Sequence, residues 1–98
     1  MADKDDKLVI ENIASPGHTY RVNAKKYMAM KAALMQVLPA EPPGLTVAAA
    51  KEALLPHLSE EHFPGGDKAG WWLKAVHLDL EAKGEIGRVP KPVRLFRR

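Results

Sequence analysis

The last third of the chain constrains the fold more than any other part. Its apolar residues recur every three or four positions from Lys68 to Lys83, a spacing that predicts one long helix. Gly84 is suited to the left-handed conformation that ends many helices. Two short β-prone runs follow, Ile86–Val89 and Val93–Phe96, with a proline-rich turn between them. A helix that leads directly into a basic β-hairpin is therefore predicted.

Two further helices are predicted before this one. Asn23 and Thr46 are good N-caps for helices over Ala24–Leu38 and from Val47 to about Leu55. A proline follows each predicted end, and proline lacks the amide hydrogen that would continue the helix. The apolar face of the first helix consists of Tyr27, Met30, Leu34, Val37 and Leu38. The inward positions of the second are Val47, Ala50, Leu54 and Leu58.

The third helix is predicted to be apolar on two opposite faces. Asp67 is its predicted N-cap, and the carboxylate also complements the positive end of the helix dipole. The face expected to meet the other two helices carries Ala69, Leu73, Val76 and Leu80. The opposite face carries Trp71, Ala75, Leu78 and Ala82, with Lys74 at its margin. This second apolar face needs a covering surface or a partner.

The N-terminal part is predicted to be an extended arm. Residues 1–7 are charged and are expected to form a disordered terminus. Within residues 8–22, two β-prone runs, Leu8–Ile10 and His18–Val22, flank a turn signal. The apolar residues of this arm need a surface to lie on.

Together these elements predict a single α+β domain over residues 8–98, a winged helix-turn-helix with three helices and a small antiparallel sheet. The segment Gly70–Gly84, followed by Ile86, resembles the recognition helix and the start of the wing in winged-helix proteins. With Pro16–Val22 and Phe63–Gly66 it makes the chain resemble, over residues 8–97, a small uncharacterised bacterial family of stand-alone winged-helix domains. This resemblance implies the fold and, by analogy, a regulatory or DNA-associated role.

Charge is unevenly distributed, although the net charge is only +3. Residues 68–98 contain eight basic and three acidic residues, and residues 17–40 contain four basic residues and no acidic one. Residues 41–67 contain five acidic residues and one lysine. Such asymmetry indicates that a polyanion or an acidic protein surface faces the C-terminal part. A solvated basic end explains the terminal arginines equally well.

A DNA-binding hypothesis places the phosphate contacts on the basic hairpin and the third helix. The candidate residues are Lys68, Lys74, Arg88, Lys91, Arg94, Arg97 and Arg98. From Asp67 to Lys83 the chain has none of the Arg, Asn, Gln, Ser or Thr side chains that usually contact base edges. Asp79 and Glu81 are expected to repel phosphate. Binding would therefore depend on salt and select weakly among sequences.

Two other interpretations of the second apolar face remain open. In one, the arm lies across Trp71 and Leu78 and simply covers them. In the other, Trp71 and Leu78 form an exposed interface for a second copy of the chain or for another protein. The adjacent Trp71 and Trp72 also suit the stacking of bases in single strands, although hydrophobic packing is the better explanation for Trp72.

Nothing in the sequence predicts an enzyme, a cofactor or a small-molecule substrate. The chain has no cysteine, and the four histidines, His18, His57, His62 and His77, lack the spacing of a metal site. Glu60, Glu61 and His62 adjoin no nucleophile or oxyanion hole. The charged first residues and the lack of a long apolar run predict a cytoplasmic protein without a membrane segment.

Overall fold

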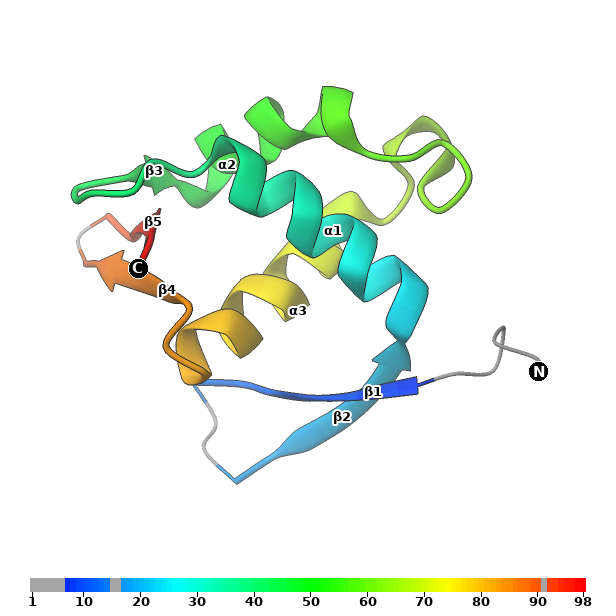
Figure 1. Cartoon of the computed structure of the whole chain (residues 1–98), viewed down its shortest axis with the longest axis horizontal. Helices are drawn as coiled ribbons and strands as arrows, with labels where there is room; N and C mark the ends of the chain where they lie inside the picture. The colour runs from blue at the N-terminus through cyan, green and yellow to red at the C-terminus, as the bar shows by residue number, and fades with distance from the viewer. Residues whose placement is uncertain (1–6, 15–16, 91) are drawn as a thin grey trace.

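The computed structural model describes residues 7–14, 17–90 and 92–98, which form three α-helices and two small antiparallel sheets (Figure 1). The predicted arm is a hairpin of β1 (Lys7–Glu11) and β2 (Thr19–Asn23), in which Lys7 pairs with Asn23 and Glu11 with Thr19. The expected extended pieces are thus confirmed. Of the terminus predicted as residues 1–7, residues 1–6 lie outside the described residues and Lys7 begins β1.

The first two helices begin where the sequence predicts. In α1 (Ala24–Val37) the side chain of Asn23 accepts a hydrogen bond from the amide of Lys26, at 3.0 Å. In α2 (Val47–Leu54) the hydroxyl of Thr46 accepts from the amide of Ala49, at 3.1 Å. The helix then gives way to a 3₁₀ turn, Leu55–His57, because Pro56 cannot donate to the preceding turn.

The start of α3 (Ala69–Ala82) corrects the prediction made for its cap. Asp67 ends a 3₁₀ turn, Pro64–Gly66, and does not cap α3. The N-cap is Lys68, in the left-handed conformation with a φ of 61°, and its side chain makes no capping hydrogen bond. The Pro64–Gly66 turn places the chain so that the helix begins two residues after the predicted cap. The predicted core face of α3, by contrast, is confirmed: Ala69, Leu73, Val76 and Leu80 are all buried.

The second sheet has three strands in the order β3-β5-β4. The strand β3 (Leu45–Thr46) pairs antiparallel with β5 (Arg94–Arg97), and β5 pairs antiparallel with β4 (Ile86–Val89). The predicted hairpin is therefore confirmed, with its second strand one residue later than expected. Gly84, at a φ of 78°, makes the turn between α3 and this hairpin.

The helix α3 lies at the centre of the molecule (Figure 1). It packs against α1 and α2 on one side and against the β1–β2 hairpin on the other, while the C-terminal hairpin follows its end. Every residue from Ala75 to Glu81 is buried as a result. A helix covered on both sides explains why its sequence is apolar on two faces.

Candidate functional site

Asp79 of α3 forms hydrogen bonds with the N-terminal hairpin and with α1. The carboxylate is fully buried and accepts hydrogen bonds from the hydroxyl of Tyr27, from the amide of Glu11 at 2.8 Å and from Lys83 Nζ at 2.8 Å. Burial, and then the hydrogen bond to Asp79, raise the pKa of Tyr27 above its ordinary value. Because three donors satisfy it, this carboxylate holds the fold together and is not open to a ligand.

Glu81, half a turn further along α3, binds the C-terminal hairpin through Arg88. Its Oε1 accepts from Arg88 Nε at 2.5 Å, and its Oε2 lies 2.7 Å from Nδ1 of the buried His77. Burial opposes ionisation, but the hydrogen bonds from His77 and Arg88 outweigh it and lower the pKa of Glu81. The expectation that Asp79 and Glu81 repel phosphate is therefore wrong, because both carboxylates are buried, and Asp79 is paired with Lys83 and Glu81 with Arg88.

The face of α3 that a winged helix would insert into DNA is largely covered. Leu78 is only 7% exposed, and Asn12 and Tyr20 of the N-terminal hairpin lie beside it. From Ala69 to Glu81 only Gly70, Trp71 and Lys74 are exposed. The predicted interface of Trp71 and Leu78 is thereby reduced to Trp71, which is 57% exposed.

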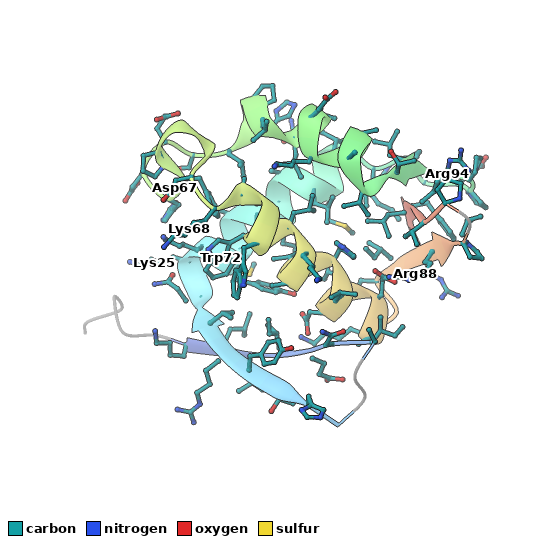
Figure 2. All side chains as sticks on the ribbon, turned by 180° about the vertical axis from the view of Figure 1, so that it is seen from behind. Lys25, Asp67, Lys68, Trp72, Arg88 and Arg94 are labelled. Atoms are coloured by element: carbon teal, nitrogen blue, oxygen red, sulfur yellow. The ribbon has the colours of Figure 1, made fainter. Side chains whose placement is uncertain are left out.

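The residues predicted to contact phosphate are divided between two regions. Figure 2 shows Lys68 near the start of α3 and Arg88 and Arg94 on the opposite side of the molecule. Arg88 binds Glu81, and Arg97 Nε donates to the carbonyl oxygen of Leu38 at 2.8 Å.

Among the remaining candidates, Arg98 and Lys74 are exposed and Arg94 is half-buried. Lys91 lies outside the described residues. The C-terminal hairpin therefore offers fewer unengaged cations than the sequence alone indicates.

A basic groove lies beside the start of α3. Its volume is about 660 Å³, and its lining residues come from β1, β2, α1 and α3. They are Lys7, Arg21, Val22, Asn23, Lys26, Lys68, Trp71 and Trp72. Within the described part of the chain, no ion pair joins the four basic side chains to a carboxylate. This basic groove thus gathers four basic side chains that have no ion-pair partner among the described residues, a charge distribution that attracts anions.

A smaller aromatic pocket adjoins the basic groove and shares Trp71 with it. Its volume is about 210 Å³, and it is lined by Asn12, Tyr20, Trp71, Lys74, Ala75 and Leu78. Tyr20 is 43% exposed, so two accessible aromatic rings border a floor made of buried residues. This aromatic pocket therefore offers planar apolar surfaces with one amine at its edge.

The exposed Trp71 is held by aromatic neighbours. Its ring meets that of the buried Trp72 edge to face, with centroids 5.2 Å apart, and Trp72 meets Phe63 in the same way at 6.2 Å. Edge-to-face contacts are favourable arrangements of aromatic quadrupoles. Trp72 is 7% exposed, which confirms the prediction that it packs in the core. A chain of rings thus runs from the core to the surface.

Three basic residues of the groove, Lys7, Arg21 and Lys26, were not among the residues predicted from the sequence. For Arg21 and Lys26 the available signal was the basic composition of residues 17–40, which contain no acidic residue, whereas Lys7 follows two aspartates and carried no such signal. That signal does not say where those residues face. Only the packing of the hairpin and α1 against α3 brings them beside Lys68 and Trp71.

Within the described ranges, no three histidine, aspartate or glutamate side chains come together where they could hold a metal ion. None of the helices described is long and apolar enough to cross a membrane.

In class, the protein is a small mixed α and β domain with three α-helices and antiparallel sheets in its described part. The chain belongs to the family described as "Family of unknown function (DUF6958)", whose sequence model matches residues 7–95. This membership agrees with the resemblance to an uncharacterised family. Neither a curated protein nor a solved structure matches the chain in the same comparisons.

Proposed function

We propose that this protein is a winged-helix domain that binds nucleic acid through its basic groove. The order of its elements supports the proposed fold. A short strand between α1 and α2 pairs with the last strand of a hairpin that follows α3, and the sheet order is β3-β5-β4. Helix, strand, two helices and a hairpin is the arrangement from which winged helix-turn-helix domains are built.

The observation that carries the proposed function is the basic groove itself. Four basic side chains from separate elements line it, and no described carboxylate pairs with them. Concave surfaces that carry only positive charge attract phosphate backbones. Binding then releases the counterions that are condensed on the nucleic acid. The proposed contact is therefore centred on Lys26 and Lys68, with Lys7 and Arg21 around them, while Arg94 and Arg98 supply weaker, distant contacts.

Little reading of base edges is expected. The N-terminal hairpin covers the side of α3 that would enter a major groove, and the exposed residues between Ala69 and Glu81 include one cation, Lys74. Phosphate contacts position a protein on nucleic acid but carry no sequence information. We infer modest affinity that depends on salt and differs little between sequences.

The test compares two double variants that each remove two positive charges. Lys26→Gln with Lys68→Asn removes two of the four positive charges of the groove, asparagine being tolerated at the positive φ of position 68. Arg94→Gln with Arg98→Gln removes two positive charges from the C-terminal hairpin and serves as the matched control. Fluorescence polarisation with a labelled oligonucleotide at several salt concentrations measures the affinity of each.

The groove variant should lower affinity and reduce the slope of log affinity against log salt by roughly 0.7 to 0.9 for each lost phosphate contact. The hairpin variant should change both much less. Greater loss in the hairpin variant would assign binding to Arg94 and Arg98, and a wild-type protein that binds no oligonucleotide at low salt would contradict the proposed function.

A second candidate function is an interface for a second copy or another protein, favoured by the exposed apolar residues Val9, Tyr20 and Trp71. It predicts a dimer or complex that Trp71→Ser disrupts. Sedimentation of the wild-type chain over a range of concentrations checks for self-association. A monomer at every concentration would exclude a homodimer and leave binding to a different protein as the second candidate function.

We propose a binding module without enzymatic activity or cofactor. The buried ionisable groups of α3, His77, Asp79 and Glu81, are bonded to one another or to neighbouring elements and line neither the basic groove nor the aromatic pocket. General acid or base catalysis needs such a group within reach of a substrate.

A further inference from the structure

The basic groove and the aromatic pocket are neighbours, because Trp71 lines both. Trp71 thus lines a groove that also has four basic residues, and a pocket that also has Tyr20 and the apolar floor of Ala75 and Leu78. A nucleotide has two parts that a protein can recognise, a phosphate and a planar base. The basic groove suits the phosphate, and the adjacent aromatic pocket suits the base. We propose that the aromatic pocket receives an unpaired nucleobase of a single strand whose phosphates lie in the basic groove, an inference that rests on the proposed function.

The size of the aromatic pocket suits one base. At about 210 Å³ it is smaller than typical sites for drug-sized ligands, which occupy about 300–1,000 Å³. Its floor is Ala75 and Leu78, while Asn12 and Lys74 provide polar groups at the rim. A planar ring system can therefore bury its faces against aromatic and aliphatic surface and keep its polar edge near an amide and an amine.

The geometry of Trp71 favours stacking. The edge-to-face contact with Trp72, itself held by Phe63, restricts the ring while leaving 57% of the residue exposed. A ring that is ordered before binding loses less conformational freedom when a base stacks on it. Proteins that bind single strands combine exposed aromatic rings of this kind with a basic groove.

A single strand fits this surface better than a duplex or an acidic peptide. The bases of a duplex are stacked on one another and cannot enter a pocket beside the backbone unless they are flipped out. An acidic peptide would satisfy the cations of the groove, but carboxylates have no planar ring for the pocket between Tyr20 and Trp71. The chemistry shared by single-stranded DNA and RNA fits both parts.

The experiment uses the full chain and five ligands with the same number of charges. They are a short oligothymidine, an oligouridine, an abasic oligomer with the same phosphates, a hairpin duplex and a polyglutamate peptide. Fluorescence polarisation measures affinity, and quenching of tryptophan emission reports stacking. The variants are Trp71→Leu, which keeps an apolar side chain without a stacking ring, and Trp71→Tyr, which restores a ring.

Wild-type protein should bind oligothymidine or oligouridine at least about fivefold more tightly than the abasic oligomer, with quenched emission. Trp71→Leu should bind the strands with bases no more tightly than it binds the abasic oligomer, and Trp71→Tyr should recover part of the preference. The two strands with bases distinguish DNA from RNA as the source of the base.

Three results would overturn the inference. Equal affinity of the wild-type protein for the abasic oligomer and the strands with bases would show that no base is bound, while phosphate binding by the groove would stand. Tighter binding of the duplex, or of polyglutamate with equal quenching, would assign the surface to those ligands. Binding of no oligonucleotide at low salt would remove the proposed function and this inference together.

Discussion

At the scale of single residues, two carboxylates on α3 decide how the surrounding elements are attached. Asp79 bonds to the first hairpin and to α1, and Glu81 bonds to β4 through Arg88. Buried charges are destabilising unless they are paired and hydrogen-bonded. The pairing of each therefore makes a measurable contribution.

Replacing Tyr27 by phenylalanine removes one of the three donors of Asp79 without creating a cavity. A buried charged acceptor that loses a donor costs about 1–3 kcal/mol, so we expect the free energy of unfolding to fall by that amount. Chemical denaturation measures it. The control Tyr20→Phe removes a hydroxyl from an exposed residue and should change stability by no more than about 0.5 kcal/mol. Equal effects at both positions would argue against the importance of the Tyr27 bond.

The lowered pKa of Glu81 predicts a loss of stability in acid. The folded state holds this group ionised below its ordinary pKa of 4.5, so its contribution is complete above that value and is lost as the pH falls through the folded-state pKa. The free energy of unfolding should decrease with falling pH in that window, and Glu81→Gln should show a shallower decrease. Denaturation at a series of acidic pH values checks this. Parallel curves for the two proteins would contradict the assignment.

At the scale of elements, close backbone contacts determine where glycine is required. Gly44 precedes β3, and a Cβ atom built there would lie 2.0 Å from the carbonyl oxygen of Leu95 in β5. Gly65 also has a positive φ, 63° against 86° at Gly44, but apart from its two chain neighbours no atom of the described residues lies within 4 Å of a Cβ built there. Both positions therefore require a positive φ, but only Gly65 has room for a Cβ atom.

Gly65→Ala should cost only the strain of a left-handed residue, about 1–2 kcal/mol. Gly44→Ala should cost a further ~1–3 kcal/mol, because its methyl group pushes the chain away from β5. Thermal or chemical denaturation of both variants measures the difference. If Gly44→Ala were no more destabilising than Gly65→Ala, the close approach of this loop to β5 would be contradicted.

At the scale of the whole molecule, the elements share one core through α3. Ile10 of the first hairpin, Leu34 of α1 and Leu95 of β5 belong to the same buried cluster as Leu73 and Leu80. A chain of this size with one core unfolds as a single unit. We therefore propose that no part of the described chain, including the N-terminal hairpin, is an independent domain.

This proposal predicts one cooperative unfolding transition. Tryptophan emission reports the region of Trp71 and Trp72, and far-ultraviolet circular dichroism reports the helices throughout the chain. Both signals should change with the same midpoint in urea. An earlier midpoint for tryptophan emission would show that the groove region opens before the rest.

The sequence determined those features that depend on neighbours along the chain. Apolar spacing predicted the buried face of α3, and Asn23 and Thr46 predicted the starts of α1 and α2 because a cap acts within three residues. The cap at Asp67 was wrong because the Pro64–Gly66 turn redirected the backbone, an outcome that residue preference alone does not encode.

The surface depended on contacts between residues distant in sequence. Leu78 and Trp71 have similar positions on the wheel of α3, yet the hairpin covers one and leaves the other exposed. The basic residues differ in the same way: Arg88 is paired with a buried glutamate, while Lys26 and Lys68 line a groove together with Trp71. Helical periodicity predicts which residues share a face, but only packing decides what lies against that face. Packing therefore also decides where this protein exposes charged and aromatic side chains to a partner.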